Sequence, residues 1–82
     1  MFEIIFTRKF KKDVKKNHSL RKQISKQVDL FINNKEHPSL HSEKLQPKHY
    51  ERYSFRINKQ YRVIYTFEDN IPVLLYISKH YE

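Results

Sequence analysis

Residues 52–67, RYSFRINKQYRVIYTF, contain two predicted strands joined by a short polar turn. The first part alternates polar and apolar side chains, and the last part is rich in β-branched and aromatic residues, as strands with one buried face are. If the turn has three residues, Ile57 pairs with Tyr61, and Arg56 lies opposite Arg62 on the same face. The pattern therefore predicts a hairpin that brings two arginines together.

This arginine pair suggests an anion site. Like charges that face each other across a ladder cost about 0.2–1 kcal/mol. A bound phosphate would remove the repulsion, because guanidinium groups hold phosphate oxygens with paired hydrogen bonds and stay charged. The ordinary alternative is that Arg56 and Arg62 pair with acidic residues on the sheet surface, such as Glu68, Asp69 or Glu82.

The overall charge is consistent with such a site. The chain has 17 Lys and Arg residues against 9 Asp and Glu residues, a net charge of +8 over 82 residues. On so small a protein, this excess favours binding to nucleic acid or to an acidic protein. A well-solvated basic surface is the alternative explanation.

Length and composition exclude several classes of protein. We expect one domain over residues 1–82, because the chain is too short for two cores. The absence of glycine and cysteine excludes glycine-rich phosphate loops, disulfides and thiolate metal sites. His37 and His41 have Pro38 between them and no obvious third ligand, so no metal or small-molecule cofactor is expected. No signal peptide or run of about 20 apolar residues is present, so we expect a cytoplasmic protein without a membrane partner.

Apolar periodicity outlines the remaining elements. We expect a strand at residues 2–6, a helix over residues 8–17 capped by Thr7, and a second helix that Ser19 caps and that ends near residue 34. The second helix carries an apolar stripe at spacings of four, four and three: Leu20, Ile24, Val28 and Phe31.

The rest of the chain completes an α+β domain. Residues 35–51 contain two prolines and are expected to form a loop. Asn58 is expected to supply a left-handed turn residue where glycine is missing, and residues 73–78 are expected to form the last strand. The predicted order is β-α-α-β-β-β, with two N-terminal helices packed on a mostly antiparallel four-stranded sheet.

The element order, length, basic charge and hairpin sequence resemble the RelE/ParE superfamily of bacterial toxin–antitoxin toxins. The ending Lys79-His80-Tyr81 looks most like the YoeB branch of RelE-type messenger-RNA interferases. The resemblance covers essentially the whole chain, with the hairpin and the C-terminal residues as its specific part. It implies a metal-independent endoribonuclease that cuts messenger RNA in the ribosomal A site and is neutralised by a cognate acidic antitoxin.

The resemblance also implies roles for individual residues. The general base of the YoeB-like branch falls on Glu43, whereas other RelE-type enzymes use lysines here, and Lys44 fits that pattern as well. The arginines that would stabilise charge on the phosphate fall on Arg56 and Arg62. The identity of the base therefore stays open between a glutamate and a lysine.

The closing His-Tyr pair of the family falls on His80 and Tyr81. His80 suits proton transfer to the leaving oxygen, because the ordinary pKa of histidine is near 6.5. Tyr81 would stack on a base. Three further basic residues are expected to attract RNA without taking part in catalysis: Lys44, Lys48 and Arg52.

Two other functions remain compatible with the sequence. The ParE branch of the same superfamily inhibits DNA gyrase without catalysis, and fold alone does not separate it from the nuclease branch. A basic RNA-binding module would need only positive charge and exposed tyrosines, and its binding would weaken steeply with salt. The nuclease differs from both in requiring Arg62 together with the terminal His-Tyr pair.

Overall fold

The structure is a computed structural model, and it describes residues 3–79. Short 3-10 turns at His18–Leu20, Pro38–Leu40 and Lys48–Tyr50 separate the main elements. In chain order these elements are β1 (Ile5–Phe6), α1 (Arg8–Lys16), α2 (Arg21–Asn33), β2 (Glu43–Lys44), β3 (Tyr53–Arg56), β4 (Tyr61–Glu68) and β5 (Ile71–Lys79). Neither helix of this part of the chain is long and apolar enough to cross a membrane.

The sheet has five strands in the order β1-β5-β4-β3-β2, one more than the sequence predicts. The additional strand, β2, lies inside the predicted loop 35–51 and pairs Glu43 with Ser54. Two residues are too few for an alternating pattern to be detected, so the sequence gives no signal for this strand. β1 runs parallel to β5, and the other neighbours are antiparallel. The α+β class is confirmed, and the strand count is corrected.

The hairpin register agrees with the prediction. Arg56 pairs directly with Arg62, and Ile57 donates its backbone N–H to the carbonyl of Tyr61 over 2.9 Å. The expected left-handed conformation of Asn58 is wrong. Instead, its side-chain oxygen accepts hydrogen bonds from the backbone N–H groups of the two residues that end the turn, at 2.8 and 2.9 Å. A side-chain turn of this kind needs no positive φ.

Two of the four left-handed residues found among residues 3–79 lie in the next turn. Asp69 and Asn70 have φ angles of 51° and 66° and join β4 to β5 directly. Two positive φ values in a two-residue loop match the twist of the adjoining strands, and Asp and Asn tolerate them better than other non-glycine residues. This chain therefore forms its tightest hairpin without glycine.

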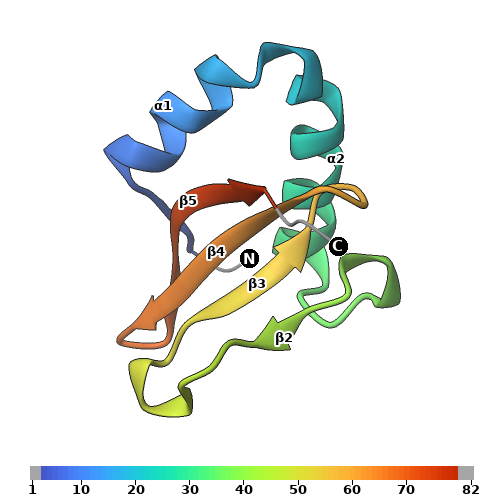
Figure 1. Ribbon diagram of the computed structural model, residues 1–82. Coiled ribbons are helices and arrows are strands. Elements are labelled where there is room, and N and C mark those ends of the chain that lie inside the picture. The colour runs from blue at the N-terminus through green and yellow to red at the C-terminus, as the bar shows by residue number, and fades with distance from the viewer. Residues whose placement is uncertain (1–2, 80–82) are drawn as a thin grey trace.

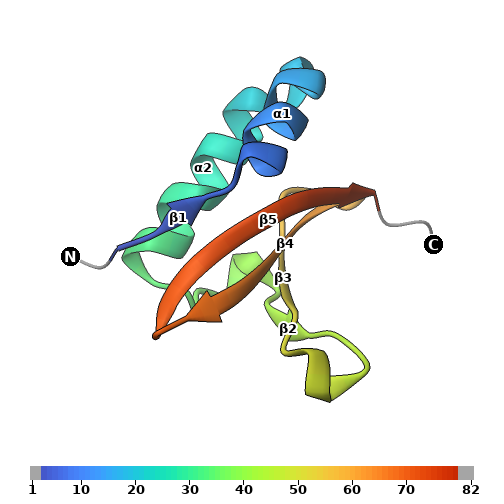
Figure 2. The same cartoon turned by 90° about the vertical axis from the view of Figure 1, so that its left-hand side faces the viewer.

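Both helices pack on one face of the sheet (Figures 1 and 2). Thr7 caps α1 as predicted, accepting a hydrogen bond from the Phe10 N–H at 3.1 Å. The predicted cap at Ser19 is wrong, because a 3-10 turn occupies residues 18–20 and α2 begins at Arg21 without a side-chain cap. The core joins the two helices to the strands through Phe10, Ile24, Val28, Phe31, Leu40, Phe55, Ile57, Val63, Tyr65 and Leu74.

A buried carboxylate connects α1 to the last strand. Asp13 is only 5% exposed, and its Oδ2 accepts a hydrogen bond from the backbone N–H of Ile77 at 3.0 Å. Its Oδ1 pairs with the ammonium group of Lys9. β1 pairs with β5 only as far as Leu74, so beyond this point Asp13, in place of a strand, accepts the hydrogen bond from the backbone N–H of Ile77. One backbone N–H on the free edge of β5 is thus satisfied by a helix side chain.

Candidate functional site

The sheet face opposite the helices carries the arginine pair. Successive side chains of a strand point to opposite faces, and directly paired residues share a face. Cross-strand pairing therefore places these residues together on this surface, which we call the arginine face: Glu43, Ser54, Arg56, Arg62 and Ser78. Figure 2 shows the helices on one side of the sheet and the loop that joins β2 to β3 on the other.

Arg62 is held in place by three neighbours. Its Nε donates to the Ser54 hydroxyl oxygen over 2.8 Å, and its Nη2 donates to the backbone carbonyl of His41 over 2.6 Å. The same Nη2 lies 3.8 Å from the Oε1 atom of Glu43. The Arg62 side chain is 13% exposed, whereas that of Glu43 is 58% exposed. The guanidinium group is therefore fixed, while the carboxylate beside it remains accessible.

Arg62 keeps both its charge and spare hydrogen-bond donors. Burial lowers the pKa of Arg62, Glu43 raises it and Arg56 lowers it further. Because an arginine side chain is not deprotonated in proteins, the charge persists. A guanidinium group has five N–H donors, and only two are used in these hydrogen bonds. Arg62 can therefore still bind an anion.

Arg56 contributes a second cation to the arginine face. Its side chain is half-buried and forms no hydrogen bond or ion pair with any of residues 3–79. Its backbone is anchored from the helix side, because the buried Gln27 amide donates to the carbonyls of Arg56 and Ser39 at 2.7 and 3.2 Å. A fixed backbone and a guanidinium group without such contacts in the described residues suit a residue that binds a ligand.

The three predicted residues Glu43, Arg56 and Arg62 thus come together on one face. Lys44 does not join them, because it lies on the other side of β2, with its Nζ 5.6 Å from the ring centroid of Tyr53. The pairing of Ser78 with Arg62 brings the end of β5 to this site.

The remaining predicted residues lie elsewhere or beyond the described part. Arg52 Nη1 donates to the carbonyl of Tyr50 at 3.1 Å in the loop before β3. The backbone of Lys48 begins the last 3-10 turn, in the same loop. His80 and Tyr81 lie outside the described residues.

Sequence reasoning missed the residues that position the arginines. Ser54 and Gln27 are buried polar groups, and His41 acts through its carbonyl. The predicted register was a usable signal for Ser54, because this residue lies two positions before Arg56 on β3, on the same face, and is therefore diagonal to Arg62 on β4. No sequence pattern reveals a backbone carbonyl as an acceptor, so the role of His41 was not predictable.

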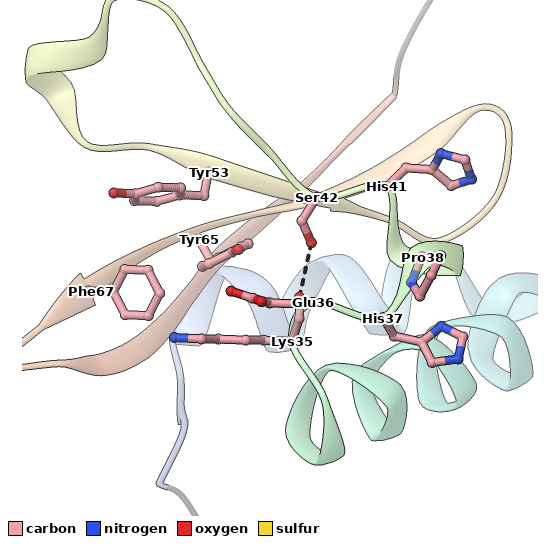
Figure 3. Close-up of a pocket in the computed structure, with 9 residues that line it drawn as sticks. All are labelled: Lys35, Glu36, His37, Pro38, His41, Ser42, Tyr53, Tyr65 and Phe67. Carbon is pink, nitrogen blue, oxygen red and sulfur yellow. Dashed lines mark hydrogen bonds between the residues drawn. The ribbon is translucent and has the colours of Figure 1, made fainter.

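A separate pocket of about 570 Å³ opens on the helix side of the sheet (Figure 3). Its aromatic side comes from Tyr53, Tyr65 and Phe67, and Lys35 Nζ lies 5.1 Å from the Phe67 ring centroid. The Ser42 hydroxyl donates to the Lys35 carbonyl at 3.3 Å. No group of three metal-binding His, Asp or Glu side chains occurs within residues 3–79. The pocket lies across the sheet from the arginine face.

The sequence matches a known toxin family over nearly its whole length. Residues 6–80 match the family described as RelE-like toxin of type II toxin–antitoxin system HigB. The chain belongs to this HigB-like family of RelE-like toxins. The toxin is also 44% identical over 43 residues to an uncharacterised protein of Haemophilus influenzae, a match that covers 52% of this chain and 43% of that relative. The chain therefore spans less than half of the length of that relative.

Solved structures share the fold of this RelE-like toxin. The YoeB–YefM complex from Staphylococcus aureus contains a chain that is 27% identical, with a TM-score of 0.72 and 99% of both chains covered. The Escherichia coli DinJ–YafQ complex contains a chain of 19% identity and a TM-score of 0.78, covering 98% of this chain and 94% of that one. At this lower identity, the likeness to YafQ concerns the fold alone.

Proposed function

We propose that this RelE-like toxin is a metal-independent endoribonuclease that cuts messenger RNA on the ribosome. The observation that carries the proposal is the direct pairing of Arg56 with Arg62 on an exposed face, with the Glu43 carboxylate 3.8 Å from Arg62. Two guanidinium groups on directly paired residues can hold the phosphate that is to be cleaved. The positive charge that a metal ion would otherwise bring to phosphorus then comes from the protein.

The chemistry requires the ribose 2′-hydroxyl as the nucleophile. Glu43 accepts its proton, the 2′-oxygen forms a bond to phosphorus, and the bond from phosphorus to the 5′-oxygen breaks. His80 donates a proton to that leaving oxygen, so the products are a 2′,3′-cyclic phosphate and a 5′-hydroxyl end. Arg62 stabilises the charge that develops on phosphorus, a contribution of the kind worth roughly 10²–10³ in rate.

The partners follow from the charge and the family. A net charge of +8 would attract messenger RNA and ribosomal RNA, and the cytoplasm supplies both. The S. aureus relative is a YoeB–YefM complex, and the E. coli relative is a DinJ–YafQ toxin–antitoxin complex. By analogy, an acidic antitoxin would bind this chain, with a segment that folds as it binds. The proposal requires no membrane and no small-molecule cofactor.

Primer extension on a reporter message in a cell-free translation reaction tests the proposal. Wild-type protein should produce discrete cDNA stops within translated codons, each marking a new 5′ end of the message. Arg62→Ala should reduce them at least about 100-fold, because a preorganised donor to the phosphate is lost. Arg21→Ala is the matched control, since it removes an exposed arginine from the start of α2 on the helix side.

The ends of the product test the chemistry separately. Transesterification leaves 5′-hydroxyl ends, which polynucleotide kinase labels directly, and a 2′-deoxy substitution at the cleaved position should abolish the reaction. Ends that carry a 5′-phosphate would contradict the proposed role of the 2′-hydroxyl. An intact message with folded wild-type protein would contradict the nuclease proposal itself and would favour gyrase inhibition or RNA binding without cleavage.

A further inference from the structure

Tyr76 is an exposed aromatic residue on the arginine face. It is 39% exposed and pairs with Ile64 of β4. Ile64 lies two residues after Arg62 on that strand. Ile64 and Arg62 share a face because side chains of a strand alternate. Tyr76 therefore lies on the same surface as the arginine pair, on the neighbouring strand.

The environment of Tyr76 differs from that of the core aromatics. Tyr53, Tyr65 and Phe67 contact one another in stacked or edge-to-face pairs at centroid distances of 5.3–5.7 Å on the helix side. The ring of Tyr76 forms no such contact with any of residues 3–79. Core packing therefore does not account for an aromatic residue at this position.

The spacing from Arg62 suits one nucleotide of a single strand. Arg62 pairs with Ser78, so Tyr76 is its diagonal neighbour on β5. Side chains in this relationship have Cβ atoms roughly 7–8 Å apart or less, which long and aromatic side chains bridge. A phosphate bound by Arg62 would leave an adjoining base free to reach the ring of Tyr76. Its direct partner Ile64 is only 5% exposed, so Tyr76 is the accessible apolar group of this pair.

We propose that Tyr76 is a stacking platform for a nucleobase of the single-stranded RNA whose phosphate is held by Arg56 and Arg62. This inference rests on the proposed function, because it takes the arginine pair to be a site for an RNA phosphate. Stacking on an aromatic ring tolerates every base, since each base has a π face. Tyr76 thus contributes affinity and position at this site, with little dependence on sequence.

The absence of tryptophan from the chain permits a direct test. Tyr76→Trp introduces a single indole, whose emission should be quenched as single-stranded RNA stacks on it. The probe is an oligoribonucleotide with 2′-O-methyl groups, which block the nucleophilic oxygen and so prevent cleavage. Phe6→Trp is the matched control, because Phe6 is 37% exposed and its ring contacts Phe10 on the helix side. Its emission should not change on addition of RNA.

Binding by fluorescence anisotropy completes the test. Tyr76→Ala should weaken binding at least about fivefold, whereas Tyr76→Phe should stay within about twofold of wild type, because stacking needs the ring and not the hydroxyl. Equal losses in the Ala and Phe variants, or an unquenched Trp at position 76 while Arg62-dependent binding persists, would overturn the stacking role and leave the nuclease proposal intact.

Loss of the proposed function would look different. If Arg62→Ala binds RNA as tightly as the wild-type protein does, the arginine pair is not a phosphate site, and both proposals are wrong. If Tyr76→Trp is quenched by an acidic peptide as strongly as by RNA, the ring is part of a protein-binding surface, which also overturns the inference.

Discussion

Ser54 and Arg62 are joined across neighbouring strands by a 2.8 Å hydrogen bond from Nε to the serine hydroxyl oxygen. Ser54 is fully buried, so the acceptor has little freedom to move. Together with the contact between Nη2 and the His41 carbonyl, it holds the guanidinium group at two of its nitrogen atoms. The charge on the arginine face is therefore preorganised before any ligand arrives.

Ser54→Ala should lower cleavage more than it lowers RNA binding. The variant keeps the Arg62 charge but loses the contact that orients it, and small misplacements of a catalytic group cost up to roughly 100-fold in rate. We expect a fall of about 10- to 100-fold in single-turnover cleavage, with a stability loss of about 1–3 kcal/mol from the broken charged hydrogen bond. Ser25→Ala, on the exposed side of α2, is the control. Unchanged cleavage by folded Ser54→Ala would show that Arg62 needs no such support.

Arg56→Gln should separate stability from activity. Replacing the charged side chain with a shorter, neutral polar one removes the repulsion across the Arg56–Arg62 pair. We expect the free energy of unfolding in urea to rise by about 0.2–1 kcal/mol, while cleavage falls strongly. A variant that is less stable than wild type at an unchanged m-value would contradict the claim that the pair is strained without a ligand.

Asp13 should make the domain sensitive to acid. Burial raises the pKa of Asp13, but hydrogen bonds from Lys9 and from the Ile77 N–H outweigh this effect, and the net pKa lies below the ordinary 3.8. A carboxylate with a lowered pKa contributes stability that is present above its unfolded pKa and is lost as the pH falls through its folded pKa. Wild-type stability should therefore fall steeply below about pH 4.

The Asp13→Asn variant provides the comparison for this pH dependence. It should unfold more easily at pH 7, by about 1–3 kcal/mol, because the charged hydrogen bonds are lost. Below the folded pKa the difference should shrink, since the wild-type carboxyl is then also neutral. Urea unfolding at pH 7 and at a series of decreasing acidic pH values measures how the difference changes. Parallel pH profiles for the two proteins would show that another carboxylate is responsible.

The hairpin was predictable because its information is local. A three-residue turn fixes the register, and the register alone places Arg56 opposite Arg62. The strand β2 was not predictable, because two residues in a loop carry no strand pattern of their own. Their strand conformation depends on pairing with β3, where Glu43 lies opposite Ser54. Asp13 looks like a solvated charge in a lysine-rich helix. Its burial depends on a hydrogen bond from the backbone N–H of Ile77, 64 residues away. That N–H reaches Asp13 only once the sheet has formed.

The candidate site also has a part that was predictable from the sequence and a part that was not. The arginines were found from charge and alternation, which are properties of the strands themselves. The side chains that orient them come from other elements: Gln27 from α2, and the His41 carbonyl from the turn before β2. Such supporting contacts depend on how the layers meet, and a single sequence does not encode them in any local pattern.

Glu43→Gln and Lys44→Ala should identify the general base. The carboxylate of Glu43 lies on the arginine face, 3.8 Å from Arg62, whereas Lys44 lies over the ring of Tyr53 on the other side. We therefore expect Glu43→Gln to reduce the rate of cleavage at least about 100-fold, in the range of general-base contributions. It should bind RNA as well as wild type or better, because a negative charge next to the phosphate site is lost. Lys44→Ala should reduce cleavage only through weaker RNA attraction, an effect that disappears at saturating RNA. Single-turnover rates and anisotropy on the same samples distinguish the two, and a rate loss confined to Lys44→Ala would assign the base to the lysine.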